Sequence, residues 1–265
     1  MRKIVLILGA IIVMVSCSDD DKNASTPVSV DFNFTHNWDG ATIENANFEN
    51  TQYTNTFGTK QKISKLVYLI SDITFTDAAG TVYDAGDYNL INAREGTNTL
   101  FTPGIEIPTG EYAVSFTFGF DDEDNDKSGG YPDLNSDDGG WGVPNPLGGG
   151  YHYMRMEGTF EDTEGATQTY QYHTIRANRH SSLPPGPGTL EETTDTSFEV
   201  DLGTISIGEG TTITVEMNAA EWFKNPNTWN LNENSIVMMP KYDLQINMKE
   251  NGKNSVFSLG PIVNP

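Results

Sequence analysis

Apolar and polar residues alternate along much of this chain, and this period of two is the strongest constraint on its fold. In segment 28–34 every second residue is valine or phenylalanine, and a second such segment runs from Tyr112 to Phe120. Successive side chains of a strand point to opposite faces, so this alternation predicts strands with one buried face. The sequence therefore predicts β-structure for most of the chain.

Other segments carry the same pattern between clusters of Gly, Pro, Asn and Asp. They are 63–76, 81–90, 151–160, 167–176, 198–207, 211–217 and 242–248. One short helix is expected at Ala219–Lys224, where Asn218 can cap it and Glu221 occupies the capping-box position. This arrangement predicts an all-β fold, an antiparallel β-sandwich with long loops and one short helix. Residues 28–265 are expected to form a single domain, because no linker of distinct composition divides them.

The first residues have the pattern of a lipoprotein leader. Arg2 and Lys3 precede an apolar run at 4–15, which is too short for a permanent membrane span, and Cys17 follows directly after Ser16. We expect residues 1–16 to be a signal peptide and Cys17 to become the lipidated mature N-terminus, with acyl chains such as palmitate. Residues 17–27 would form an acidic tether that resembles the export signal of Bacteroidota-type lipoproteins. The predicted location is the outer membrane, exposed at the cell surface.

Charge and cysteine content limit the partners and the ligands. The net charge is −22, and loss of Arg2 and Lys3 with the leader lowers it to −24, so nucleic acid is not an expected partner. Cys17 is the only cysteine, so the folded part has neither a disulfide nor a thiolate. A metal site here would use imidazole, thioether, carboxylate, amide or a modified aromatic ring.

Candidate metal ligands gather between Phe118 and His173. His152, Met154 and Met156 alternate along one predicted strand, as a row of soft ligands or as core packing. His173 would share a face with Gln171 and Ile175. Outside this region, His36 is in phase with the apolar residues before it, which is typical of a buried core histidine as well as of a ligand. We expect His180 to be an ordinary exposed histidine.

An acidic loop raises a separate hypothesis of structural calcium. Oxygen ligands at every second position suit this ion. The residues concerned are Asp122, Asp124, Asp126, Asp133, Asn135 and Asp137. The EF-hand pattern is not met, since its glycine position holds Asp138 and its glutamate position Pro144, and a solvated acidic loop is the simpler interpretation.

The order of several motifs resembles the MbnP-like family, which includes methanobactin-associated periplasmic proteins and copper-repressible surface proteins of methanotrophs. The motifs are FTH ending at His36, FGTKQKISKLVYLISDITF, GDYNLIN, IPTGEYAVSFTFGFD, GYHYMRMEG and YQYH ending at His173. Together they cover most of the segment 28–258. Where the family pattern has a methionine and two tryptophans before GY, this chain has the single Trp141 followed by GVPNPLGGG.

The resemblance implies copper binding by two histidines and a tryptophan that is oxidised to kynurenine. A dihaem partner of the cytochrome c peroxidase type performs that oxidation in the family. The family's residues carry over to His36, His173 and Trp141, and His152 and Met154 are further soft ligands nearby. Neutral imidazoles suit copper, and kynurenine offers an aryl amine that indole lacks. The inserted Pro and Gly residues could instead leave Trp141 packed on the sandwich end or exposed.

The sequence also bears on two other classes of function. Trp38, Trp141, Tyr131 and Tyr151 on Gly- and Asp-rich loops could form a flat platform for a glycan or a protein partner. An enzyme is not expected, because the chain has no nucleophile elbow, zincin motif or phosphate-binding loop before a helix. The sequence therefore predicts a copper-binding lipoprotein that captures, stores or hands over the metal.

Overall fold

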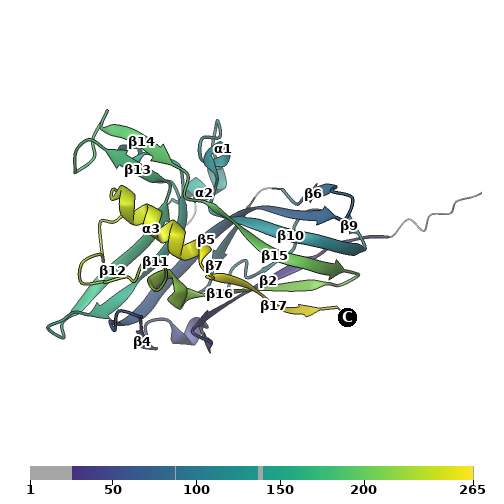
Figure 1. Ribbon diagram of the computed structural model, residues 1–265, viewed down its shortest axis with the longest axis horizontal. Coiled ribbons are helices and arrows are strands. Elements are labelled where there is room, and N and C mark those ends of the chain that lie inside the picture. Colours follow the sequence, from purple (N-terminus) through teal and green to yellow (C-terminus); the bar gives the residue numbers. More distant parts are fainter. Residues whose placement is uncertain (1–25, 87, 137–139, 265) are drawn as a thin grey trace, which may run out of the picture.

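The computed structural model describes residues 26–86, 88–136 and 140–264, and these form two packed β-sheets with a helix alongside (Figure 1). This confirms the predicted all-β sandwich. The leader, Cys17 and the acidic tether as far as residue 25 lie outside the described residues. Within the part of the chain that is described, no helix has the length and apolarity needed to cross a membrane.

The larger sheet is built around one long strand, β5 (Lys60–Asp77). Its strands follow the order β12, β11, β5, β10, β15, and β4, β6 and β7 also pair with β5. Their bounds are β4 Tyr53–Thr54, β6 Val82–Asp84, β7 Tyr88–Asn92, β10 Gly110–Phe118, β11 His152–Glu161, β12 Thr167–Ile175 and β15 Phe198–Ile207. All these pairings are antiparallel.

The second sheet follows the order β17, β16, β2, β3, with β8 also paired to β2. Its strands are β2 Asp31–Trp38, β3 Ala41–Thr42, β8 Leu100–Phe101, β16 Thr212–Asn218 and β17 Phe257–Val263. The β2–β16 pair is parallel, which departs from the antiparallel pattern of the other pairs. Two small pairs complete the β-structure: β1 (Pro27–Val28) with β9 (Ile107–Pro108), and β13 (Ala177–His180) with β14 (Leu190–Thr194).

The main helix lies where the sequence predicted a strand. Segment 242–248 was expected to be β-structure, but Tyr242–Lys253 forms α3. The buried positions are Gln245, Met248, Asn251 and Gly252, a spacing of three to four residues that matches a helix. The apolar alternation of this segment was therefore a misleading signal.

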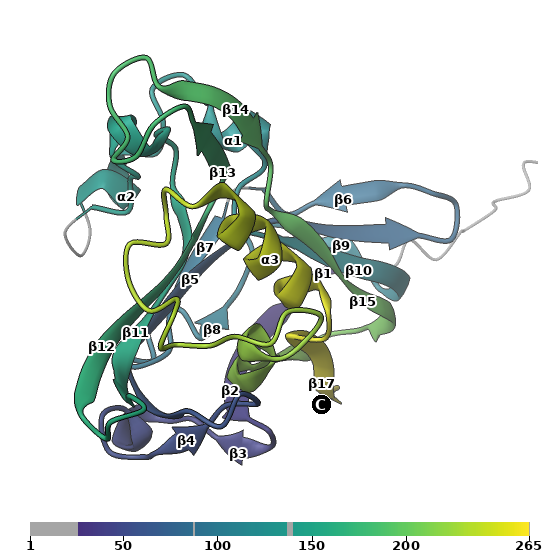
Figure 2. The ribbon, with the colours of Figure 1, turned by 60° about the vertical axis from the view of Figure 1, so that its left-hand side comes forward.

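The predicted short helix is present as the 3-10 helix η3 (Ala219–Phe223), and the Asn218 side chain accepts from the backbone N–H of Ala220 at its start. Trp222 of η3 is fully buried, with its ring 6.1 Å from that of Tyr172 on β12. The Asn251 side chain of α3 donates to the Trp222 carbonyl at 2.8 Å. Thus η3 and α3 cover the part of the large sheet that the second sheet leaves open (Figure 2). The other short helices are η1 Asn45–Asn47, η2 Asn145–Leu147, α1 Asp122–Asn125 and α2 Pro132–Ser136.

Aromatic rings fill the space between the two sheets. Phe34 of β2 lies 6.5 Å from Tyr68 of β5 and 6.3 Å from Phe116 of β10, ring centre to ring centre. Such edge-to-face pairs add to the stabilisation that burial of the rings provides. We call the face of the large sheet that carries Tyr68 and Phe116 the inner face.

Strand β5 is buried on both faces at its centre. Its ends alternate in burial, but every residue from Leu66 to Ser71 is buried. A continuous buried run requires cover on both sides of the sheet. The inner face is covered by the second sheet, so a further element must cover the opposite, outer face at this point.

Candidate metal centre

The connection between β10 and β11 supplies the cover over the outer face. Its Leu134 and Trp141 line one pocket together with Val67 of β5 and Leu90 of β7. We call its described residues, 119–136 and 140–151, the covering loop. Residues 141–143 pair back onto 150–152, since the backbone N–H of His152 donates to the Trp141 carbonyl at 3.0 Å. This short hairpin places Trp141 next to His152.

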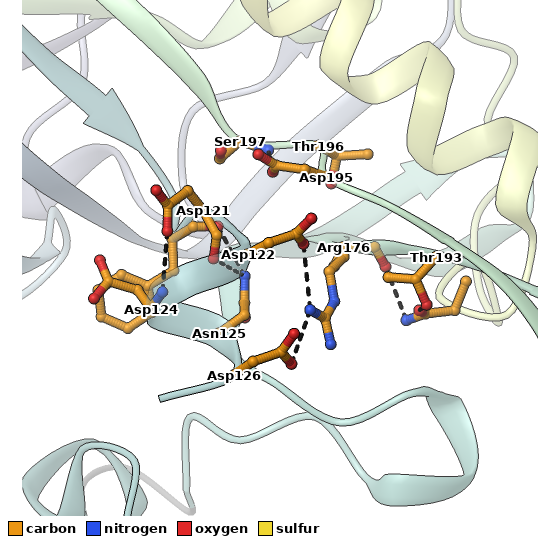
Figure 3. Close-up of polar contacts among 12 residues, drawn as sticks. Asp121, Asp122, Asp124, Asn125, Asp126, Arg176, Thr193, Asp195, Thr196 and Ser197 are labelled. Carbon is orange, nitrogen blue, oxygen red and sulfur yellow. Dashed lines mark hydrogen bonds and ion pairs between the residues drawn. The ribbon is translucent and has the colours of Figure 1, made fainter. Parts of the chain in front are cut away.

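Asn125 fixes the covering loop to the sheet. Its side-chain nitrogen donates to the Tyr153 hydroxyl at 2.7 Å and to the Phe120 carbonyl at 2.8 Å, and its oxygen accepts from the Tyr151 backbone at 3.0 Å. A Cβ on Gly150 would lie 2.6 Å from that oxygen, and the φ of +77° at Gly150 also favours glycine. Figure 3 shows Asn125 on helix α1 among the acidic residues. The loop is therefore held in place by a buried amide.

His152 lies at the start of β11 with Trp141 and Arg155 around it. Its Nδ1 is 3.0 Å from the Trp141 carbonyl, and its ring centre is 5.8 Å from the Trp141 ring. Nη2 of Arg155 lies 3.1 Å from Nδ1 and donates to the Gly140 carbonyl at 2.6 Å, while the guanidinium stacks over the Trp141 ring. Burial, and then the charge of Arg155, lower the pKa of His152 to about 3. His152 is thus a neutral imidazole at physiological pH.

His173 approaches His152 from the neighbouring strand β12. The two ring centres are 5.4 Å apart and the ring planes are nearly perpendicular. Nε2 of His173 lies 2.9 Å from Oε1 of Glu157 on β11. The hydrogen bond with His173 lowers the pKa of Glu157, so the carboxylate is charged and acts as the acceptor.

Each of the two histidines has one nitrogen held by a hydrogen-bond acceptor. Nδ1 of His152 lies between the Trp141 carbonyl, which can only accept, and the Arg155 guanidinium, which can only donate. With the carbonyl as its hydrogen-bond partner, Nδ1 of His152 carries the proton. The carboxylate of Glu157 likewise places the proton of His173 on Nε2. Nε2 of His152 and Nδ1 of His173 then carry lone pairs, and neither makes a hydrogen bond with a described residue. Metal-bound histidines commonly have this arrangement, with the second nitrogen bonded to a carbonyl or carboxylate.

The expected ligand row on β11 is interrupted by a bulge. His152, Met154 and Met156 were predicted to share one face, but the pairing with β12 shifts between His152 and Met154. One extra residue reverses the side-chain phase. His152 therefore contacts His173 on the outer face, whereas Met154 and Met156 are fully buried on the inner face. Met154 does not join the histidine pair.

His36, on β2 of the second sheet, points towards the inner face of the large sheet, as its phase predicted, and lies apart from the other two histidines. Its Nε2 is 3.1 Å from the hydroxyl of Tyr68, and burial lowers its pKa to about 4. Tyr68 and the adjacent Val67 point to opposite faces of β5, and it is Val67 that is in register with Arg155 and His173. The sheet itself separates His36 from His173, so the structure does not bring these two predicted ligands together.

The acidic residues of the covering loop contact groups of the protein itself (Figure 3). Asp122 and Asp126 both form ion pairs with the buried Arg176, at 3.3 and 3.0 Å. Asp124 accepts from the Tyr131 hydroxyl, and Asp133 accepts from the hydroxyl of Tyr88. Asn135 is exposed and Asp137 lies outside the described residues. Arg176 thus supplies positive charge where the sequence suggested calcium.

The flat aromatic platform expected on the loops is not formed. Its rings are all buried, with exposed fractions of 5% for Trp38, 1% for Trp141, 7% for Tyr131 and 6% for Tyr151. Trp38 stacks on Tyr53 at 4.9 Å. His180 is only half-buried, and its Nδ1 lies 3.1 Å from the Thr189 hydroxyl.

The donors at the outer-face histidines fit a nitrogen-bound metal only in part. Among the described residues, no three His, Cys, Asp or Glu side chains converge as a metal site, so the two histidines need a further donor. Nε1 of Trp141 is buried and has no hydrogen-bond partner among the residues that the structure describes. An indole N–H is not a metal ligand, but a donor group at this position would complete the set.

Comparison with known proteins places the chain in a family. The family model described as MbnP matches residues 27–239, which is most of the chain. The chain belongs to the MbnP family. The matched segment of this MbnP-family chain contains His36, Trp141, His152 and His173.

A solved structure, MbnP from Methylosinus trichosporium, is similar to this chain at 16% sequence identity with a TM-score of 0.44. The similarity covers 76% of this chain and 78% of the other. A search of curated proteins found no match.

Sequence reasoning missed two charged residues of the candidate site, Arg155 and Glu157. Both lie on β11, next to the methionines of the predicted ligand row. One signal was present in the sequence: the uninterrupted apolar run from Leu66 to Ile70 on the adjacent strand β5. Such a run indicates cover on both faces, and therefore a buried outer face where charged side chains need partners.

Proposed function

We propose that this MbnP-family chain is a copper-binding lipoprotein that captures, stores or hands over the metal at the outer membrane, exposed on the cell surface. The observation that carries the proposal is the pair of buried imidazoles, His152 and His173, with ring centres 5.4 Å apart beneath the covering loop. Nitrogen ligands bind such metals at about 2 Å, so this separation lets two rings share one ion. We assign no catalytic reaction to the site.

The protonation of the pair favours metal binding at neutral pH. A histidine must be neutral to donate a lone pair, and a pKa of about 3 means that His152 has no proton to displace. The Trp141 carbonyl orients the ring of His152 through Nδ1, and Glu157 orients the ring of His173 through Nε2. Orientation of this kind raises the basicity of the ligand and its affinity for the metal.

Two charges next to the pair have opposite effects on a bound cation. The guanidinium of Arg155, 3.1 Å from Nδ1 of His152, repels it. The carboxylate of Glu157, 2.9 Å from Nε2 of His173, attracts it. The two contributions have opposite sign, and the nitrogen donors supply the bonds to the metal.

Trp141 is the proposed third donor, after oxidation to kynurenine. Its Nε1 makes no hydrogen bond with a described residue, so opening of the indole ring breaks no polar contact with this part of the chain. The product carries an aryl amine, which can bind copper where an indole cannot. By resemblance to the family, the oxidant would be a dihaem partner of the cytochrome c peroxidase type.

The test is the metal content of the protein purified from its native membrane, measured by inductively coupled plasma mass spectrometry. We expect near-stoichiometric copper in the wild type and none in a His152→Ala/His173→Ala variant. His180→Ala is the matched control and should keep the metal, since His180 contacts Thr189 and not the pair. Absence of copper, both as purified and after titration with Cu(I) and Cu(II), would refute the proposal.

The same preparation tests the modification and the anchor. The intact mass of the peptide that contains Trp141 reports whether the ring is oxidised. The mass of the N-terminal peptide reports whether Cys17 carries lipid, and a Cys17→Ser variant should leave the membrane fraction. A wild-type protein that is unlipidated at Cys17 would contradict the proposed anchor.

A further inference from the structure

Arg155 contacts three parts of the candidate site with one guanidinium. Its Nη2 donates to the Gly140 carbonyl at 2.6 Å and lies 3.1 Å from Nδ1 of His152. Its Cζ lies 4.7 Å from the centre of the Trp141 ring, in a cation–π contact. The same side chain therefore touches the backbone before Trp141, the Trp141 ring and one of the two histidines.

Strand β11 fixes where this guanidinium lies. Arg155 is in register with Val67 of β5 on one side and with His173 of β12 on the other. Its backbone is thus held between two paired strands of the large sheet, and its side chain leaves the outer face beneath the covering loop. Sites built on strands are more precise than sites built on loops, so Arg155 is a firm support for a loop residue.

Trp141 needs such a support, because its local backbone is permissive. It lies between Gly140 and Gly142, and the φ of Gly140 is +82°. Glycine gives the chain more conformational freedom than any other residue. The Trp141 carbonyl accepts from His152, but Nε1 of the ring makes no hydrogen bond with a described residue. The direction of the ring therefore depends on the side chains that it packs against.

The contacts of Arg155 use features that distinguish arginine from lysine. A planar guanidinium can stack on an aromatic ring and donate hydrogen bonds from its edge at the same time. Arg155 does both, since it lies over Trp141 and donates to the Gly140 carbonyl. A lysine ammonium keeps the charge but has neither the flat face nor the rigid fork. Comparison with lysine at this position thus separates shape from charge.

The charge of Arg155 by itself works against a bound cation. Whatever other charges surround the histidine pair, a neutral residue in place of Arg155 makes the potential there more negative, and a cation binds better. A purely electrostatic role therefore predicts tighter copper binding when the charge is removed. A role in orientation predicts weaker binding, because the third donor is no longer held in its place.

We propose that Arg155 is a positioning residue, which holds the Trp141 ring against His152 and so keeps the third copper donor in place. The ring centres of Trp141 and His152 are 5.8 Å apart in this arrangement. Groups that orient metal ligands without touching the metal contribute strongly to affinity. The effect of Arg155 on copper rests on the proposed function, whereas the position of the Trp141 ring is measurable without any metal.

Acrylamide quenching of Trp141 fluorescence tests the position of the ring, in the full chain and on a preparation whose mass shows an intact tryptophan. The contribution of Trp141 is the difference between each protein and its Trp141→Phe counterpart. We expect Arg155→Lys and Arg155→Gln each to raise the quenching constant of this contribution severalfold, with the fold verified by circular dichroism. Arg179→Gln is the matched control, since Arg179 also stacks over a ring, that of Tyr242, and pairs with Glu192.

Competition with a Cu(I) chelator tests the effect on copper, on protein purified from its native membrane. We expect Arg155→Lys and Arg155→Gln to weaken binding about 10–100-fold, which is typical of groups that orient metal ligands. In a Trp141→Phe background the same substitutions should weaken binding no further, because the ring that Arg155 supports is absent. Arg179→Gln should bind copper as the wild type does.

The outcomes distinguish this role of Arg155 from the proposed function. Unchanged quenching of Trp141 in both Arg155 variants overturns the positioning role, whether or not copper binds. Copper binding that tightens in Arg155→Gln and is unchanged in Arg155→Lys also overturns it, since charge alone then explains the effect. Equal weakening with and without Trp141 shows that Arg155 does not act through this ring. Absence of copper from every protein refutes the proposed function instead, and the quenching still decides whether Arg155 fixes the ring.

Discussion

Buried histidines lie against the two faces of the large sheet in different settings. On the inner face, His36 contacts the neutral hydroxyl of Tyr68 and is packed among aromatic rings. On the outer face, His152 and His173 contact each other, a carbonyl and two charged side chains. Burial holds the pKa low for both His36 and His152, so burial alone does not identify a ligand. The difference lies in the partners, which orient the rings only on the outer face.

This contrast leads us to expect that the inner face supplies stability and the outer face supplies binding. The largest effect should follow removal of an inner-face ring. Phe118 is 1% exposed, and its ring lies 5.0 Å from Phe198 and 5.1 Å from Trp222. Phe118→Ala should lower the free energy of unfolding by about 3–5 kcal/mol, because it leaves a cavity. Urea unfolding measures this, and Phe57→Ala, at a ring that is 50% exposed, should change stability by less than about 0.5 kcal/mol.

The next effect is a pH dependence that belongs to His36. Burial lowers its pKa from the usual histidine value of 6.5 to about 4, so the unfolded chain takes up this proton first as the pH falls. The stability that His36 contributes as a neutral group is therefore complete above pH 6.5 and is lost towards pH 4, by about 3 kcal/mol in all. Unfolding of the wild type and His36→Leu between pH 7 and 4 measures it. A constant difference between the two proteins across this range would contradict the prediction.

A smaller effect should follow the loss of the Glu157 carboxylate, which forms a hydrogen bond with His173. Glu157→Gln keeps the size of the side chain but weakens the hydrogen bond that orients the ring. Copper affinity should fall about 10–100-fold, which is typical of such partners of metal-bound histidines. Glu161→Gln is the control, since Glu161 lies on the same strand and pairs with Gln52 and Lys60 instead. Equal affinity in both variants would show that Glu157 has no part in the site.

The smallest effect is expected at the acidic end of the covering loop. Asp122 and Asp126 are exposed but their partner Arg176 is buried, so Asp122→Asn/Asp126→Asn, which keeps amide oxygens as acceptors, should cost about 1–2 kcal/mol. Addition of calcium or of a chelator should leave the melting temperature unchanged, because Arg176 already balances these carboxylates. A rise in melting temperature with calcium, lost in this double variant, would support the calcium hypothesis instead.

Alternation in the sequence predicted most strands well, and it failed where the backbone departs from a regular strand. Strand β15 spans 198–207, as its alternation predicted, and β12 ends one residue before the expected position. Helix α3 was missed because Leu244, Ile246 and Met248 alternate by coincidence, while burial follows the helical spacing of Gln245 and Met248. Strand β17 was not predicted, since its exposed apolar residues do not alternate with a buried face.

The residues of the candidate site were predicted better than their arrangement. Trp141, His152 and His173 were all named from the sequence, and the structure brings them together. Two features could not be foreseen. A bulge at the start of β11 places the side chains of His152 and Met154 on opposite faces of the sheet. The position of this bulge depends on how β11 pairs with both β5 and β12. His36 matched the family motif in order, but motif order does not say which face of a sheet a residue occupies.

Whether the outer-face histidines bind copper is tested most directly by one titration. Competition with a chromogenic Cu(I) chelator would compare wild type, His36→Ala and His173→Ala, with the fold of each verified by circular dichroism. We expect His173→Ala to lose at least a hundredfold in affinity and His36→Ala to bind copper like the wild type. Loss of copper binding in His36→Ala, with affinity retained in His173→Ala, would contradict the assignment of the metal to the outer face.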